Sequence, residues 1–219
     1  ERAELYADVN IRGTAVLLSR AARTGVRGVV FASSSSVYGD GAVPFSEDAP
    51  PKPISPYGES KRTAEILVSA FGGSWEKGAV SCRLFSVYGK RQRPDLAMRK
   101  FATAILRKEE ITVYGGCTRD YTHVSDTVDG LIRALDLAAE GGNGVYNIGR
   151  GRGVSTPELI ALLEKCLGKT ARIRNAPMRA GDAKDTLASI EKAKKELGYC
   201  PRTEIEEGVA SFVRWLTGR

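Results

Sequence analysis

Apolar positions recur along the whole chain at spacings typical of helices and of buried strands. Residues 4–24 carry them at helical spacing, and residues 26–32 follow as a short continuous run rich in β-branched side chains. Residues 79–85 form a second run of this kind. By the same reasoning we expect strands at 111–114 and 144–149, and helices at 94–108, 125–140, 155–167, 189–197 and 204–217.

Two of the expected helices have clear start signals. Ser55 suits a helix cap and Pro56 the first helical position, and this helix is expected to break at Gly72-Gly73. Ser155 stands three residues before Glu158, the spacing of a capping box. Because strands alternate with helices, the fold class is α/β, a Rossmann-like doubly wound parallel sheet covered on both faces.

The composition is that of an ordinary globular protein. The 219 residues are 42% hydrophobic and 27% charged, and no run approaches the roughly 18 apolar residues that span a bilayer. The first residues lack the layout of a secretory signal, so we expect a cytoplasmic protein without membrane contact. Four widely separated cysteines form no metal-binding pair, which indicates reduced thiols and no metal site.

The chain is basic, with a net charge of +7 and a pI near 9.3. Its lysines and arginines are spread along the helices, without a recognisable nucleic-acid-binding motif. The charge therefore favours a solvated basic surface or an anionic small-molecule substrate, and we expect no nucleic-acid partner.

Tyr57 and Lys61 form the most informative pair in the sequence. Four residues apart on a helix, they lie on one face, where the ammonium can favour the phenolate form. A tyrosine, whose ordinary pKa is about 10, would then serve as a base near neutral pH. Taken alone, this spacing is weak evidence, since a surface tyrosine would satisfy it equally well.

A row of hydroxyls precedes this pair. Ser33 to Ser36 follow a predicted buried strand, and open α/β sheets bind their ligands at the carboxyl ends of strands. A polar turn would explain the serines without any function. The two motifs together, in this order, favour a catalytic site.

Several further short motifs occur in order along nearly the whole chain. They are Asp8-Val9-Asn10 with Gly13-Thr14, Ser55-Pro56-Tyr57 through Lys61, Arg83-Leu84-Phe85-Ser86-Val87-Tyr88-Gly89, Arg119-Asp120-Tyr121 and Arg179-Ala180-Gly181-Asp182. With the serine row, they resemble the extended short-chain dehydrogenase/reductase family, in particular its NAD-dependent nucleotide-sugar epimerases.

The resemblance implies a hydride mechanism. Tyr57 would take the proton of the sugar 4-hydroxyl while NAD+ accepts the hydride from C4, and the ketone would then receive the hydride on its other face. Ser34 would hydrogen-bond the reacting oxygen, because a hydroxyl donates or accepts by rotating. The residues expected at the cofactor are Asn10, Ser33, Tyr57, Lys61, Phe85 and Val87.

The resemblance also implies where a UDP-sugar substrate binds. The family's dehydratases and decarboxylases carry an acidic residue near Ser35, whereas Ser34 to Ser36 include no carboxylate, which favours an epimerase. Guanidinium groups bind diphosphates well. The expected substrate residues are Ser34, Ser35, Ser36 and Ser86 at the sugar, Arg119 and Arg179 at the diphosphate, Asp182 at the ribose or uracil, and Thr112 and Tyr114 beside the uracil.

Residues 89–95 resemble a loop that offers an arginine to the sugar carboxylate in UDP-glucuronate 4-epimerases. Arg93 is the candidate, and holding the carboxylate would keep a 4-keto uronate from losing CO2. If the loop is instead a general feature of sugar epimerases, the protein would be a UDP-glucose (galactose) 4-epimerase. His123, the sole histidine, is expected to be structural.

The glycine-rich fingerprint that binds the pyrophosphate of NAD does not occur in this sequence. We expect a chain truncated before its N-terminal strands; the alternative is a non-catalytic remnant that binds sugar nucleotides. Residues 1–89 and 117–149 are expected to be the remaining NAD-binding domain, and 90–116 and 150–219 a small C-terminal α/β lobe that binds the nucleotide sugar. The family usually forms homodimers through helices, here within 1–24 and 58–71.

Overall fold

A computed structural model describes residues 2–75, 77–178, 181 and 183–218. Its central sheet is parallel, with β1 (Gly28–Ser34) beside β2 (Gly78–Leu84) and β2 beside β6 (Gly144–Ile148). All three strands were expected from the apolar pattern. Their carboxyl ends meet at one edge of the sheet.

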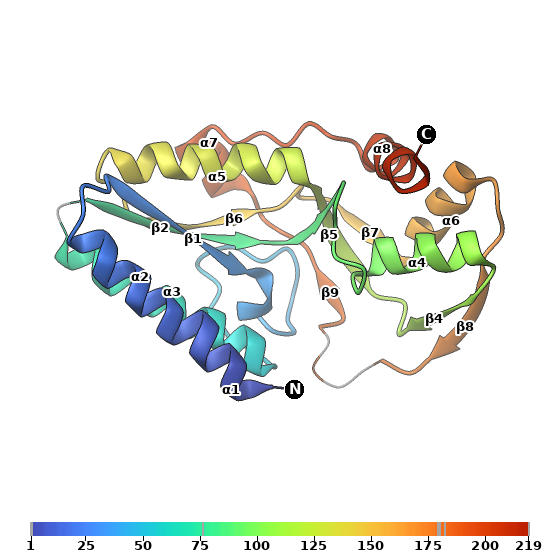
Figure 1. The fold of residues 1–219 in the computed structure, drawn as a ribbon, viewed down its shortest axis with the longest axis horizontal. Helices are drawn as coiled ribbons and strands as arrows, with labels where there is room; N and C mark the ends of the chain where they lie inside the picture. Colours follow the sequence, from blue (N-terminus) through green and yellow to red (C-terminus); the bar gives the residue numbers. More distant parts are fainter. Residues whose placement is uncertain (1, 76, 179–180, 182, 219) are drawn as a thin grey trace.

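Helices cover both faces of this sheet (Figure 1). On one face lie α2 (Gly13–Ala22) and α3 (Pro56–Ser74), and on the other α5 (Val124–Ala139) and α7 (Glu191–Leu197). Alternate side chains of β2 supply the two cores: Ala79 packs with Leu18 and Val68 beneath α2 and α3, whereas Val80 and Cys82 pack with residues of α5 and α7. The expected α/β fold with a parallel sheet is confirmed.

The N-terminal helical segment is continuous, but its helix type changes along its length. Ala3–Tyr6 (α1) is α-helical, Ala7–Arg12 (η1) is π-helical, and α2 continues from Gly13. Apolar spacing predicted a single helix here, because the wider winding of a short π segment leaves the overall pattern nearly unchanged.

Helix α3 begins as expected, since the Ser55 side chain accepts a hydrogen bond from the backbone N–H of Gly58 at 3.1 Å. The expected break at Gly72-Gly73 is wrong, because the helix runs on to Ser74. A side chain at Gly72 would clash with Oδ1 of Asn143. This glycine therefore permits a close approach and does not end the helix.

A second group of strands was largely missed by the sequence reasoning. It contains β3 (Ser86–Tyr88), β5 (Thr118–His123), β7 (Gly153–Ser155) and β9 (Asp185–Thr186), all paired through β5. Most are too short to show a period in sequence. The buried Asp120 joins the distant segments, accepting hydrogen bonds from the backbone N–H groups of Arg150, Gly151 and Ala188.

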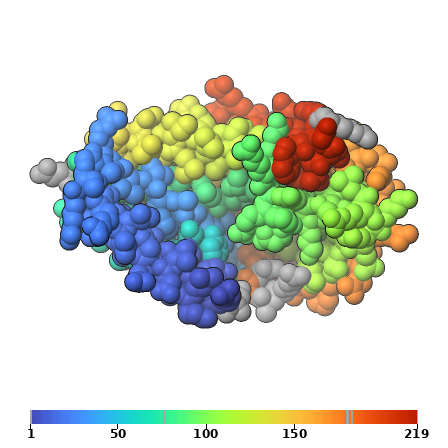
Figure 2. Space-filling view, viewed as in Figure 1, coloured from blue at the N-terminus to red at the C-terminus, as the bar shows by residue number. Residues whose placement is uncertain are grey.

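The C-terminal end of the molecule has its own core. β4 (Glu110–Tyr114) pairs with β8 (Arg172–Ala176), and α4 (Ala97–Arg107), α6 (Thr156–Leu167) and α8 (Ile205–Thr217) pack together beside them. In Figure 2 a recess separates this end from the N-terminal helices. The proposed division into a cofactor domain and a lobe stays a prediction.

No helix among the described residues is long and apolar enough to cross a membrane. The four cysteines, all described, are free thiols. The cytoplasmic location stays a prediction.

Candidate active site

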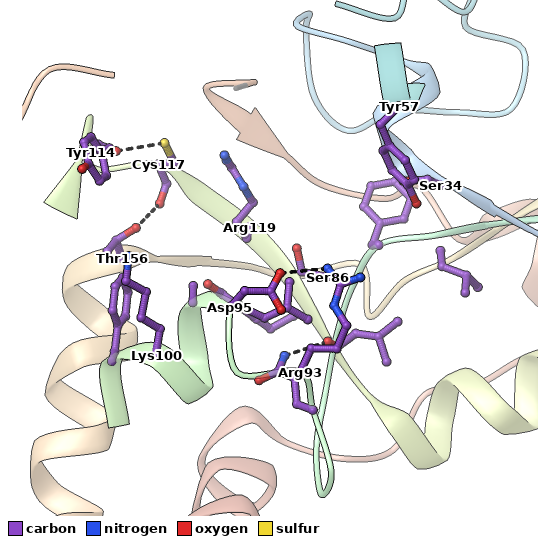
Figure 3. Close-up of a pocket in the computed structure, with 18 of the residues that line it drawn as sticks. Ser34, Tyr57, Ser86, Arg93, Asp95, Lys100, Tyr114, Cys117, Arg119 and Thr156 are labelled. Carbon is purple, nitrogen blue, oxygen red and sulfur yellow. Dashed lines mark hydrogen bonds and ion pairs between the residues drawn. The ribbon is translucent and has the colours of Figure 1, made fainter. Parts of the chain in front are cut away.

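A pocket of about 560 Å³ lies between the carboxyl ends of β1 and β2 and the β4–α4 end of the molecule. Figure 3 shows Tyr57 and Ser34 together at one end of it, and Tyr114 and Thr156 at the other. It thus joins residues that are more than a hundred positions apart in sequence.

The first wall of the pocket carries the expected catalytic group. Tyr57 is half-buried in the first turn of α3, with its ring edge-on to Tyr6 at 5.6 Å between centroids. One turn further, the Lys61 amine lies 5.9 Å from the Tyr57 ring centre and donates to the Ala32 carbonyl at 2.9 Å. Partial burial lowers the pKa of Lys61. A phenol, an amine and the Ser34 hydroxyl therefore share one wall.

The serine row divides between two environments. Ser34 caps the short 3-10 helix η2 (Ser35–Val37), accepting from the backbone N–H of Ser36 and donating to its hydroxyl, each at 3.1 Å. Ser35 and Ser36 line a smaller polar pocket of about 200 Å³, which shares Ser86 and Arg119 with the large one. They do not line the main pocket, and their contact with the sugar stays a prediction.

Two of the predicted cofactor residues have their side chains engaged elsewhere. Ser33 is buried and donates to Oε1 of Glu65 at 2.6 Å, so its hydroxyl is directed into the protein. Asn10 donates to the Ser60 hydroxyl at 2.9 Å and does not line the pocket. Its role at NAD stays a prediction without support from this geometry.

The segment that follows β2 forms the floor. Phe85, Ser86 and Val87 all line the pocket, and their contacts with cofactor and substrate stay predictions. Gln92 donates to the carbonyl of Val87 at 3.0 Å and so ties the following loop to this floor.

Arg93 also lines the pocket, but it has an acidic neighbour. Its guanidinium pairs with the carboxylate of Asp95 at 3.0 Å, and the two side chains are 72% and 66% exposed. Figure 3 shows the pair in the middle of the pocket. An exposed pair of this kind is weak, so an incoming anion can compete for the arginine.

Arg119 has a structural task in addition to facing the pocket. It donates to the carbonyls of Thr118, Ala183 and Lys184 at 2.7 to 2.9 Å, which uses three of its five N–H groups. The other two N–H groups have no hydrogen-bond partner among the described residues. Arg179 and Asp182, the other predicted diphosphate and nucleoside contacts, lie outside the described residues.

Thr112 and Tyr114 bring the end of β4 to the pocket, and their place beside the uracil stays a prediction. The Thr112 hydroxyl accepts a hydrogen bond from Arg174 at 3.1 Å. Sequence reasoning missed several lining residues, among them Lys100, Asp95, Cys117 and Thr156. Lys100 was the one with a signal, because it is a basic residue on the helix that was expected directly after the Arg93 loop.

Charge is unevenly distributed in this pocket. Among its described lining residues, Lys61, Arg93, Lys100 and Arg119 are cationic, and Asp95 is the single carboxylate. The arrangement suits an anionic ligand that reaches from the phenol to the far end.

Several known proteins are similar to this chain. An uncharacterised protein of Methanocaldococcus jannaschii, MJ1055, is 41% identical over 96% of this chain and 65% of its own length. A UDP-glucuronate 4-epimerase of Thermodesulfobacterium geofontis is 35% identical over 96% of this chain and 66% of its own. The chain therefore spans about two thirds of the length of these relatives.

Solved structures are also similar to this chain. MoeE5, in complexes with NAD and either UDP-glucose or UDP-glucuronic acid, matches with a TM-score of 0.92 and 37% identity, over 97% of this chain and 72% of that one. The family model described as the NAD dependent epimerase/dehydratase family matches residues 1–149, which hold the serine row, Tyr57 and most of the pocket. The chain belongs to the NAD dependent epimerase/dehydratase family.

Proposed function

We propose that this protein is an NAD-dependent UDP-sugar 4-epimerase that acts on UDP-glucuronate. One observation carries the proposal: Tyr57, Lys61 and Ser34 line one wall of a pocket whose other charged residues are mostly cations. NAD, when bound, supplies the acceptor and donor of the C4 hydride.

The described residues fit the nicotinamide end of this cofactor. The floor of the pocket is apolar at Leu84, Phe85 and Val87, and the adjoining wall carries a half-buried amine, Lys61, suited to the hydroxyls of a ribose. Tyr57 completes this wall. The glycine-rich pyrophosphate fingerprint is not in the sequence, so the fit concerns the nicotinamide half alone.

The protein's part in the reaction is proton transfer at the sugar 4-oxygen. Tyr57, in its phenolate form, takes the proton of the 4-hydroxyl. It returns this proton once the keto sugar has rotated and the hydride has been added to its other face. The charge of Lys61 stabilises the phenolate. Ser34 hydrogen-bonds the 4-oxygen both as hydroxyl and as ketone, because its own hydroxyl can donate or accept by rotating.

The scarcity of carboxylates among the described lining residues supports epimerisation over elimination. Asp95 is the one carboxylate among the described lining residues, and it is paired with Arg93. Ser35 and Ser36, where related dehydratases have an acid, carry hydroxyls. A reaction that stops after hydride exchange needs no further proton donor.

Two sugars compete as substrates. Arg93 supports UDP-glucuronate, because a guanidinium in this position can pair with a sugar carboxylate. UDP-glucose is the second candidate, since Asp95 already neutralises Arg93 and since MoeE5 forms complexes with either nucleotide sugar.

Product analysis tests the proposal directly. The intact protein is incubated separately with UDP-glucuronate and UDP-glucose, and the sugar of each product is identified. We expect UDP-galacturonate from the first and little conversion of the second; no conversion of either would refute the activity. Absorbance of the denatured protein tests for bound NAD, which the non-catalytic alternative would lack.

A homodimer is the oligomeric state that we propose. Val9, Val16, Leu17 and Ile66 are between 52% and 71% exposed on the helical segments η1, α2 and α3, the segments predicted to form the interface. Light scattering after size-exclusion chromatography measures the mass in solution, and a monomer would contradict this part.

A further inference from the structure

Three polar side chains form one row across the central sheet, directly beneath the pocket. Ser33 of β1 is in register with Arg83 of β2, which is in register with Asn147 of β6. All three are at most 3% exposed. Each of the three stands one residue before its strand's member of the next row, which contains Ser34. The buried row therefore lies directly behind residues that line the pocket.

Glu65 meets this row from helix α3. It lies four residues after Lys61 and eight after Tyr57, so the three side chains project from the same face. Its carboxylate is buried and accepts hydrogen bonds from Nε and Nη2 of Arg83, each at 2.9 Å. It also accepts a hydrogen bond from the Ser33 hydroxyl at 2.6 Å.

The guanidinium of Arg83 also lies against an aromatic ring, which is itself held by an amide. The ring of Tyr38 lies 4.7 Å from Cζ of Arg83, and the Tyr38 hydroxyl donates to Oδ1 of Asn147 at 2.7 Å. At the protein surface, Arg62 reaches the second Glu65 oxygen at 3.3 Å. The buried pair is therefore joined to all three strands and to α3.

Such a buried ion pair adds little to the free energy of folding, but it fixes the geometry of the groups that it joins. Two buried charges cost desolvation that their attraction barely offsets, and apolar residues often replace them without loss. A two-pronged guanidinium–carboxylate contact, however, fixes distance and angle together. Here it fixes the depth and rotation of α3 against β2, and the Ser33–Glu65 hydrogen bond links α3 to β1, the strand that carries Ser34.

We propose that Glu65 and Arg83 are positioning residues, which hold α3 so that Tyr57 and Lys61 lie beside Ser34 on one wall of the pocket. This inference rests on the proposed function for its kinetic consequence. Small displacements of reacting groups are costly, and roughly an ångström can lower a rate about a hundredfold.

The test removes both charges at once in the intact protein with NAD bound. Glu65→Gln with Arg83→Met leaves no charge of the pair stranded in the core, and the new amide would still accept from Ser33. Leu163→Ala is the matched control, because Leu163 is fully buried in the C-terminal core away from α3. Each variant is studied by urea unfolding, by kcat and KM, and by hydrogen exchange of residues 56–65.

We expect the double variant to unfold near the wild-type urea concentration, with kcat lowered roughly ten- to a hundredfold, KM changed less than about twofold and exchange at 56–65 accelerated. Leu163→Ala should unfold more easily with kcat unchanged. A double variant with wild-type kcat and exchange would overturn the inference, as would an equal loss of kcat in Leu163→Ala.

Two further outcomes separate the ways in which the experiment can fail. If the wild-type protein converts no sugar nucleotide, the proposed function fails, and exchange at 56–65 alone decides whether the pair holds α3. If the double variant does not fold, Ser33→Ala removes the hydrogen bond from β1 to Glu65, and the NAD content shows whether cofactor binding is also changed. This variant should lower kcat at unchanged KM and NAD content, and wild-type kinetics would overturn the inference.

Discussion

The amine of Lys61 donates a hydrogen bond to the backbone carbonyl of Ala32 at 2.9 Å. This carbonyl stands two residues before Ser34 on β1. The helix that carries Tyr57 is thus attached to the strand that carries the proposed oxygen-binding serine. Because this hydrogen bond holds Lys61 at the end of β1, the four-residue spacing places Tyr57 and Lys61 on the pocket wall that also carries Ser34.

Tyr57→Phe should abolish interconversion, with kcat falling at least about a hundredfold while UDP binding stays within about twofold. The ring remains, so the packing against Tyr6 is kept, and only the proton acceptor is lost. Tyr6→Phe is the matched control and should retain full activity. Turnover by Tyr57→Phe at the wild-type rate, measured by product formation, would refute its role as the base.

Lys61→Met should lower kcat about tenfold or more, because the phenolate loses its nearby charge. Lys77→Met is the control: Lys77 also donates to a backbone carbonyl, that of Val26 at 2.8 Å, but it lies outside the pocket. Steady-state kinetics distinguish the two, and equal losses in both variants would mean that the lysine acts only on packing.

Arg93→Ala should raise KM for UDP-glucuronate about tenfold, equivalent to about 1.4 kcal/mol, and leave KM for UDP-glucose unchanged. The control is Arg91→Ala, an exposed arginine of the same loop that does not line the pocket. Asp95→Asn should act in the opposite direction, because it frees Arg93 from its ion pair. A loss on both sugars with Arg93→Ala would argue against carboxylate recognition.

His123 should titrate below its ordinary pKa of about 6.5. Burial lowers its pKa, and its Nδ1 accepts from the backbone N–H of Ser125 at the start of α5, where a positive charge is unfavourable. The folded state therefore binds fewer protons than the unfolded state just below pH 6.5. Stability should rise with pH through the folded pKa and level off above about 6.5.

Nuclear magnetic resonance detects this titration directly, because the chain has a single histidine. Urea unfolding between about pH 5 and pH 8 gives the matching stability change. His123→Asn keeps a good helix cap and should remove that histidine step. A titration midpoint at or above about 6.5 would contradict the expectation.

Gly208→Ala should destabilise the protein by about 1–3 kcal/mol, because the added carbon would clash with the Tyr88 hydroxyl. Tyr88→Phe in the same chain should recover part of this loss. Gly73→Ala, in a helix with nothing within 4 Å, should instead stabilise by about 0.5–1 kcal/mol. Thermal or urea unfolding gives both signs, and equal effects of the two glycines would disprove the steric argument.

Local patterns in the sequence were sufficient for much of the fold. The apolar runs at 26–32 and 79–85 became adjacent parallel strands, and Ser55 capped its helix, because burial and capping depend on near neighbours. The Tyr57–Lys61 spacing likewise follows from helix geometry alone. In the same way, the ordered motifs pointed to the family.

Tertiary structure decided what the remaining side chains do. Ser33 to Ser36 look equivalent in sequence, yet Ser33 turns to Glu65, Ser34 lines the main pocket, and Ser35 and Ser36 line its neighbour. Arg119 gives three donors to backbone carbonyls, and Gly72 serves a close contact inside a helix. The order of residues along the chain determines which near neighbours can act together, whereas contacts between distant segments depend on how helices and sheets pack.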